Sequence, residues 1–210
     1  MRIKRYLFIL FVLTVLFCSY LMLRITLPYF SFDYGIGFLL TKQAILHIDL
    51  WRWAFYIHIS SSFFVLLLGV FQFIPFLLEK YPVLHRQSGK VYVFLVLFLC
   101  APSGLIMAFY ANGGFWARLS FVIIAVLWWG FTYKAYTDIR KKKLQAHVAG
   151  MTLSYALTLS AITLRSYVFF LPGFIHLHAK EMYILVAWLS WIPNLLIAEL
   201  INRKRKKRVL

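Results

Sequence analysis

Carboxylates are scarce in this chain. The 210 residues include 6 Asp and Glu against 23 Lys and Arg, for a formal net charge of +17. In a soluble protein such a balance suggests a nucleic-acid partner. Here the basic residues cluster at the ends of long apolar runs, where basic side chains set membrane topology. We therefore interpret the charge as topological and expect no nucleic-acid binding.

Cysteine is equally scarce, and the familiar catalytic motifs are missing. The two cysteines, Cys18 and Cys100, both fall inside apolar runs, which excludes a disulfide framework and a cysteine-based metal site. The chain has no glycine-rich phosphate loop, nucleophile elbow or HExxH zinc motif, and no lipidation signal. The sequence therefore predicts no particular enzyme class.

Apolar residues are abundant instead. They make up 63% of the chain, and the mean hydropathy is +0.80, whereas soluble domains are about 45–50% apolar. One soluble core cannot bury such a surplus, so the solvent must be lipid. A spanning helix takes roughly 20 apolar residues, and helices satisfy their own backbone in hydrocarbon. The sequence predicts an all-α, polytopic bundle in one membrane domain over residues 1–210, with spans at about 6–28, 53–78, 89–111, 115–136, 147–171 and 182–201.

The first apolar run also has features of a signal peptide, because MRIKR precedes it. A cleaved signal ends in small residues, whereas this run continues into CSYLMLRITLPYF. We therefore predict that it stays in place as the first spanning helix.

The basic residues predict the orientation of the bundle. With the N-terminus in the cytoplasm, 17 of the 23 Lys and Arg residues lie on the cytoplasmic side. The six on the outer side are Arg24, Lys42, Arg52, Arg118, Arg165 and Lys180. We therefore expect both termini in the cytoplasm and the protein in the cell (inner) membrane. The tail Arg203, Lys204, Arg205, Lys206, Lys207 and Arg208 is expected to attract anionic lipid headgroups.

Polar side chains within three spans follow single helix faces. Polar groups in lipid are costly and usually face a bundle interior. His147 and Arg165 in the fifth span are 18 residues apart, which is five full helical turns. The three polar faces comprise His147, Ser154, Thr158 and Arg165; His58, Ser62, Gly69 and Gln72; and His85, Gly89, Tyr92 and Ser103. We expect the three faces to converge on one polar interior.

A purely structural interpretation competes with this one. Ser, Thr and Gly are common packing residues between membrane helices, and Arg165 can extend toward the outer headgroups. Near the end of the chain, Pro193 and Asn194 predict a kink with a polar group in the sixth span. Glu199 is expected to pair with the basic tail.

The histidines suggest a cofactor. His85 and His147 begin the third and fifth spans near the cytoplasmic face, and His58 lies a turn or two below the outer surface. Neutral imidazole is a common ligand of haem iron. We expect His85 and His147 as iron ligands of a haem b, and His58 as an outer ligand or as a hydrogen-bond partner of a quinone. Tyr92, Arg165 and Gln72 would line the same site.

Three segments resemble a known family: GVFQFIPFLLEKYPVLHRQSGKVYV, AHVAGMTLSYALTLSAITLR and WLSWIPNLLIAEL. In order and spacing they are similar to a family of bacterial membrane proteins catalogued as domain of unknown function 2306, over about His58 to Glu199. The resemblance implies a helical membrane fold without an established activity. Residues matching the family pattern are His58, His85, Arg86, Gly89, Tyr92, His147, Tyr155, Arg165, Asn194 and Glu199.

Three hypotheses follow for the function. The first is a membrane electron-transfer protein with haem or quinone among the second, third and fifth spans. The second is a small-solute or proton-coupled transporter, in which His147, Arg165 and Gln72 line a polar route. It ranks second because the sequence indicates no broken helices of the kind many carriers use. The third is a non-catalytic accessory subunit, in which the polar faces serve packing alone.

Overall fold

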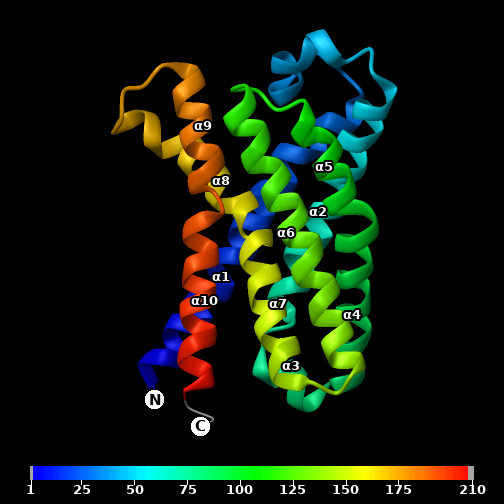
Figure 1. The fold of residues 1–210 in the computed structure, drawn as a ribbon, viewed down its shortest axis with the longest axis vertical. Helices are drawn as coiled ribbons and strands as arrows, with labels where there is room; N and C mark the ends of the chain where they lie inside the picture. Colours follow the sequence, from blue (N-terminus) through cyan, green and yellow to red (C-terminus); the bar gives the residue numbers. More distant parts are fainter. Residues whose placement is uncertain (1, 208–210) are drawn as a thin grey trace.

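The computed structural model describes the backbone of residues 2–207 and the side chains of residues 5–207, and this part of the chain is all-α without strands. It forms a bundle with six long, apolar helical segments, as predicted for a polytopic membrane protein (Figure 1). Both chain ends lie at the same end of the bundle. We call this the inner end and the opposite one the outer end. Arg208 and the side chains of Arg2 and Lys4 lie outside the described part.

The six spans run alternately between the two ends. They are α1 (Arg2–Thr26), α2 (Asp49–Phe71), α4 (Pro82–Phe94) with the π-helix η3 (Leu95–Cys100) and α5 (Ala101–Phe109), α6 (Phe115–Arg140), α7 (Leu144–Thr158) with α8 (Ser160–Phe170), and α9 (Ala179–Leu189) with α10 (Ile192–Lys206). Shorter helices connect them: η1 (Leu27–Ser31), η2 (Gly37–Ile45), α3 (Pro75–Lys80) and η4 (Leu171–Gly173).

The predicted end of the second span is wrong. We expected one helix to about residue 78, but α2 ends at Phe71. Pro75 has no N–H for the carbonyl four residues earlier and disfavours a helical conformation at the residue before it. Ile74 is accordingly extended, and residues 75–80 form the separate helix α3 at the inner end. The third span begins at Pro82, seven residues before its predicted start. The remaining ends differ from the prediction by up to five residues.

Three of the six spans change their helix geometry part of the way along, although each remains one continuous helical segment. The backbone hydrogen bonding changes from α-helical to π-helical over Leu95–Cys100, just before Pro102. The ring of a proline clashes with the carbonyl four residues earlier in a regular α-helix. Pro193 acts likewise between α9 and α10, which confirms the predicted kink. The third interruption is a single residue, Leu159, between α7 and α8. No proline stands there.

The interruptions lie at a similar depth. Counting 1.5 Å per residue from the inner helix ends, Leu159, Cys100 and Ser190 lie about 22, 27 and 24 Å along their spans. In hydrocarbon, backbone groups released by a break need partners within the protein. Ser120 donates to the carbonyl of Ala187 at 2.9 Å, and Thr163 donates to the carbonyl of Ser190. Side chains of α6 and α8 thus satisfy the break between α9 and α10.

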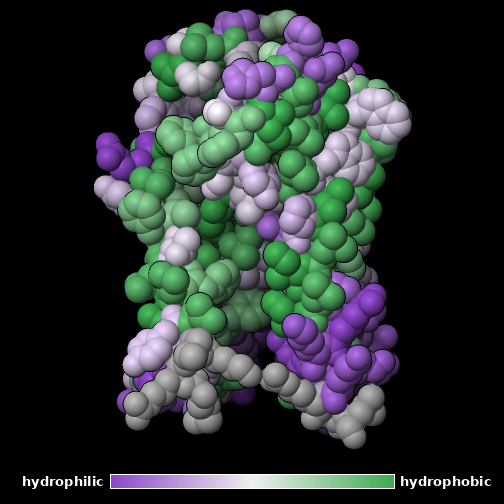
Figure 2. Space-filling view, turned by 90° about the vertical axis from the view of Figure 1, so that its left-hand side faces the viewer, coloured by the Kyte–Doolittle hydropathy of each residue, from purple (hydrophilic) through white to green (hydrophobic). Residues whose placement is uncertain are grey.

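The first span packs loosely. α1 contacts α2 and α8, and most of its large apolar side chains are exposed, among them Leu7, Leu10 and Phe17. α10 packs instead on α7. Figure 2 shows the face that carries these helices, with a largely apolar band across it and a hollow in its lower half. Exposed apolar surface of this extent is suited to lipid rather than to water.

A small aromatic cluster covers the outer ends of α2 and α5. Leu39 of η2 and Trp51 and Phe55 of α2 are 1–2% exposed. Phe38, Tyr29, Met107 and Tyr110 pack around them. The two short helices η1 and η2 are thereby fixed over the outer end of the bundle, and they contribute to both sites described below.

Candidate functional site

The faces of α2, α4 and α7 meet at Tyr92. The Tyr92 hydroxyl lies 2.9 Å from both the Ser154 and Thr158 hydroxyls, and Ser154 lies 2.7 Å from Thr132 of α6. All four side chains are buried. Chains of hydroxyl groups in a dry interior strengthen one another and fix a single packing. The structure therefore brings parts of the three predicted polar faces together.

Glycine makes this approach possible on the α2 side. A Cβ added to Gly69 would lie 2.2 Å from Cε2 of Tyr155 and 3.0 Å from Cε2 of Tyr92. The Tyr155 hydroxyl donates to the carbonyl of Leu66 at 3.1 Å, one turn before Gly69. Both aromatic rings thus occupy the groove that the missing side chain leaves.

Gln72 lies closer to the inner end. Its amide donates to the Ser88 hydroxyl at 2.8 Å, and its oxygen would contact a Cβ on Gly89 at 3.1 Å. Gln72 thus packs the end of α2 directly against α4.

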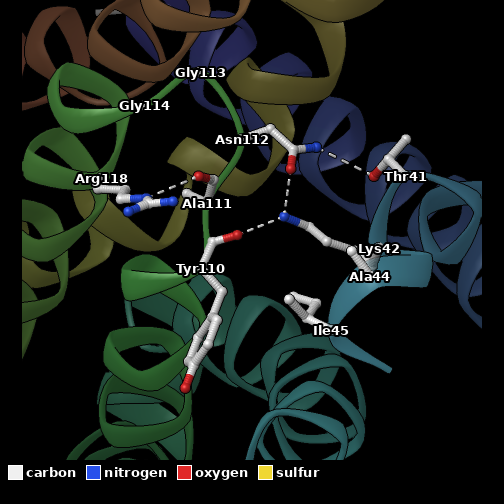
Figure 3. A pocket seen from close by; sticks show the side chains of 10 residues that line it. All are labelled: Thr41, Lys42, Ala44, Ile45, Tyr110, Ala111, Asn112, Gly113, Gly114 and Arg118. Atoms are coloured by element: carbon white, nitrogen blue, oxygen red, sulfur yellow. Dashed lines mark hydrogen bonds between the residues drawn. The ribbon is translucent and has the colours of Figure 1, made fainter. Parts of the chain in front are cut away.

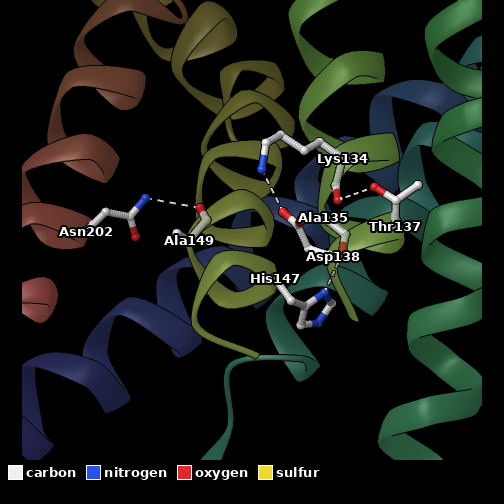
Figure 4. Close-up of polar contacts among 7 residues, drawn as sticks. All are labelled: Lys134, Ala135, Thr137, Asp138, His147, Ala149 and Asn202. Carbon is white, nitrogen blue, oxygen red and sulfur yellow. Dashed lines mark hydrogen bonds and ion pairs between the residues drawn. The ribbon is translucent and has the colours of Figure 1, made fainter. Parts of the chain in front are cut away.

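The inner histidines come from neighbouring helix ends. His147 Nδ1 donates to the carbonyl of Ala135 on α6 at 2.8 Å (Figure 4), because a carbonyl can only accept. His85 lies within electrostatic range of His147, and its buried Nδ1 has no hydrogen-bond partner among the described residues. Nearby, Asn202 of α10 donates to Ala149 and Lys134 pairs with Asp138.

His58 occupies a different place, beside the π-helix. Its Nδ1 lies 2.9 Å from the carbonyl of Cys100 and 3.3 Å from the Ser103 hydroxyl. The carbonyl bond assigns the proton to Nδ1, which leaves Nε2 as an acceptor. Gly104 makes room for the ring, since a Cβ there would lie 3.0 Å from His58 Cε1. His58 is therefore held by the interrupted stretch of its neighbouring span.

Arg165 lies in α8, in the outer half of its span. Its side chain is exposed, and His58 and Tyr29 lie within electrostatic range of it. Its guanidinium donates to the carbonyl of Ala161 at 3.0 Å. None of the ion pairs among the described residues includes Arg165. An arginine within a membrane span is normally paired or faces a polar cavity.

The acidic side chains lie at the ends of the spans or in the connections. Asp138 and Glu199 pair with Lys134 and Arg203 near the inner end, as predicted for Glu199, and Asp49 pairs with Arg52 at the outer end. Asp33, Glu79 and Glu181 lie in connections or at a helix start. The middle of the spans therefore contains cationic and neutral polar groups without carboxylates.

The six residues predicted for one cofactor site are divided among four places. Tyr92 lies in the central network, Gln72 beside Gly89, His85 and His147 at the inner end, and His58 with Arg165 in the outer half. Side chains fill the space between α2, α4 and α7 at Gly69, Gly89 and Gly104. The packing there does not fit a haem. No cluster of three or more His, Cys, Asp or Glu side chains suited to a metal ion occurs in the described part of the chain.

Asn194 and Thr163 form a polar junction between two spans, of which the sequence predicted only the Asn194 half. The Asn194 amide lies 3.1 Å from the Thr163 hydroxyl and 3.3 Å from the carbonyl of Ala156. It therefore links the break between α9 and α10 to the break between α7 and α8. The Pro193–Asn194 pair predicted one half of this junction. Thr163, one turn of helix before Tyr167 and two residues from Arg165, carried no signal of its own.

Comparison with known proteins identifies a family. The sequence model of the family described as "Predicted membrane protein (DUF2306)" matches residues 55–202, which is more than two thirds of the chain. The match includes all of α4 to α9 and most of α2 and α10, but not α1, η1 or η2. No curated protein and no solved structure matches the chain.

Proposed function

Since the chain belongs to the DUF2306 family of predicted membrane proteins, whose description assigns no activity, we propose its function from the site: it is a membrane carrier for a small anionic solute. Arg165 and His58 are the proposed contacts of the solute. Movement is proposed to occur at the interruptions within the spans α4–η3–α5, α7–α8 and α9–α10.

One observation supports this proposal above all. An arginine without a carboxylate partner lies beside three spans that break at a common depth. Carriers commonly bind their solutes near the middle of the bilayer, at discontinuous helices that can rearrange without leaving backbone groups unpaired. The carbonyls of Ala187, Ser190 and Cys100 are each bonded by a side chain of another helix. A side-chain partner can be replaced by another donor when the helices rearrange.

The charge of the site favours an anion. A guanidinium presents a planar fork of donors that matches a carboxylate or a similar oxyanion. His58 Nε2, as an acceptor, suits the hydroxyl or the protonated acid of a solute.

Currents across proteoliposomes test this function. The purified protein is reconstituted and adsorbed to a solid-supported membrane, and a panel of small anions is applied: lactate, succinate, glutamate, sulfate and phosphate. We expect a saturable current, or a proton flux reported by an enclosed pH dye, with at least one anion. Vesicles with the His58→Ala variant are expected to respond at least about tenfold more weakly, since one contact is worth about 1.4 kcal/mol at that ratio. Responses equal to those of protein-free vesicles for small organic and inorganic anions alike would argue against the carrier and for a packing or accessory role.

A second candidate is electron transfer at the inner end. His147 donates Nδ1–H to a backbone carbonyl, which is how metal-bound imidazoles are commonly oriented, and His85 lies near it. Such a site would hold haem b or a quinone outside the packed interior. A reduced-minus-oxidised visible spectrum of protein from haem-replete cells tests the haem: a colourless preparation rules that version out.

The orientation remains a proposal that the basic residues support. Lys141, Lys142 and Lys143 lie in the inner connection between α6 and α7, and Arg203 to Lys207 end α10. By the positive-inside rule this end faces the cytoplasm, so we place the protein in the cell membrane. The exposed tail is suited to anionic headgroups there.

A further inference from the structure

A cavity of about 250 Å³ opens at the outer end, between η2 and the loop that joins α5 to α6 (Figure 3). Its walls include Thr41, Lys42, Tyr110, Asn112 and Arg118. A water molecule occupies about 30 Å³ of the liquid, so the space accommodates one small solute. It lies apart from Arg165, beyond the aromatic cluster of η2 and α2.

Lys42 is the most unusual group in this cavity. Its side chain is 3% exposed, and its ammonium donates to the carbonyl of Tyr110 at 2.6 Å and to Oδ1 of Asn112 at 2.7 Å (Figure 3). An ammonium has three N–H groups, so one remains. Burial, together with the nearby Arg118 charge, lowers the pKa of Lys42 to about 8. In the described residues no carboxylate pairs with either cation.

Arg118 and the start of α6 complete the donor set. Arg118 Nε donates to the carbonyl of Ala111 at 3.3 Å, and its two terminal nitrogens have no hydrogen-bond partner among the described residues. Gly114 precedes α6 without a side-chain cap, which leaves the amides of the first turn open. Gly113 and Gly114 have φ of 84° and 79°, a conformation that favours glycine.

We propose that this cavity is a binding site for a phosphate-class oxyanion, either free phosphate or the phosphate of an outer-leaflet lipid headgroup, held by Lys42, Arg118 and the first amides of α6. Two fixed cations suit the several oxygens of a tetrahedral phosphate group better than a single carboxylate. The buried, uncompensated ammonium is costly in an empty fold. The anion removes that cost. The site is independent of the proposed carrier function.

Binding of inorganic phosphate tests the free-anion form. The full-length protein in a neutral detergent is titrated with phosphate at pH 8, with sodium chloride of equal ionic strength as the reference, and binding is followed by calorimetry and by the unfolding temperature. We expect saturable binding and a higher unfolding temperature than in chloride. Arg118→Gln, at an exposed side chain, is expected to weaken binding at least about tenfold. Arg52→Gln is the matched control, because Arg52 is an outer cation that pairs with Asp49.

The dependence on pH distinguishes the roles of the two cations. Phosphate is a dianion throughout pH 8–10, so the change there comes from the protein. Lys42 loses its proton as the pH rises past its lowered pKa of about 8, and affinity is expected to fall. The other titratable groups in the cavity wall are Arg118 of α6 and Tyr110. Lys180 of α9 approaches the edge of the cavity, since its Cε would lie 3.7 Å from a Cβ on Gly114. Lys42→Gln is expected to bind weakly and to lose the decline between pH 8 and 9, while Arg118→Gln keeps it.

A lipid source is distinguished by nanodiscs. If the ligand is a headgroup, phosphate has little effect on protein with bound lipid, and native mass spectrometry finds phosphatidylglycerol retained by the wild type and lost in Arg118→Gln. If phosphate stabilises no more than chloride and lipid retention is equal in both proteins, the proposal is overturned. Equal phosphate affinity in wild type and Arg118→Gln overturns it as well.

Discussion

Replacing Arg165 with glutamine is expected to abolish solute-dependent currents without lowering the unfolding temperature. The guanidinium is the proposed cationic contact, so its loss removes most of the attraction for an anion. Among the described residues, its one hydrogen bond goes to the carbonyl of Ala161. A charged arginine at a helix centre costs about 2.5–3.5 kcal/mol on insertion scales. Its removal is therefore expected to leave the stability in detergent unchanged or to raise it.

Two further variants make this result specific. Arg165→Lys retains the charge without the planar fork, and is expected to keep a reduced current. Arg24→Gln removes an exposed cation of α1 near the outer end, and is expected to behave as the wild type. A marked fall in unfolding temperature for Arg165→Gln would mean that the arginine is a structural element, and would contradict its assignment as a solute contact.

Replacing Gly69 with alanine is expected to have the largest effect on stability. The added methyl group would lie 2.2 and 2.3 Å from two carbons of the buried Tyr155 ring, so the ring or α2 must move. The hydroxyl of that ring is bound to Leu66 on the same helix, which limits the movement available. Overpacking of a core costs about 1–3 kcal/mol, or about 2–10 °C in unfolding temperature for a chain of this size.

The matched control is Gly130→Ala in α6. A Cβ at Gly130 meets nothing within 4 Å, and alanine favours a helix over glycine by about 1 kcal/mol in general. Differential scanning fluorimetry of both variants is expected to show a fall for Gly69→Ala and no fall for Gly130→Ala. Equal unfolding temperatures for the two variants would contradict the close contact of α2 with Tyr155.

Much of the fold follows from the sequence because hydrocarbon imposes simple rules. Apolar length alone predicts six helices, and helical phase predicts that Gly69, Tyr92 and Ser154 face one another. The phase argument works wherever a span is a regular helix. The phase argument fails for Arg165. This residue shares a predicted face with Ser154 and Thr158, but its exposed side chain lies in α8, beyond the interruption at Leu159.

The interruptions were harder to predict because their causes lie in tertiary contacts. Pro193 signals one break from the sequence, and Pro102 precedes no visible change in apolar pattern. Leu159 is an ordinary helix former whose position is set by hydroxyl groups folding back on the backbone, such as Ser160 onto Leu157 at 2.5 Å.

The basic residues at the outer end also indicate where the candidate binding sites lie, which the prediction of topology did not use. The positive-inside rule leaves few reasons for a cation at the outer end. Arg52 pairs with Asp49. Lys42 and Arg118 line the outer cavity, and Arg165 lies in α8 in the outer half of its span. No periodicity connects residues 42 and 118, since their contact depends on η2 folding over the loop between α5 and α6.

The central claim is that the region of Arg165 opens to each side of the membrane in turn. Labelling a residue beside Arg165 from each side of the membrane tests this claim most directly. In a background with Cys18→Ala and Cys100→Ala, a cysteine replaces Ala161, whose carbonyl binds Arg165. Ser31→Cys and Gln87→Cys serve as markers of the outer and inner ends, both being exposed. A membrane-impermeant maleimide is expected to label Ala161→Cys in both right-side-out and inside-out vesicles. Labelling from one side alone would contradict a carrier and leave a static polar site.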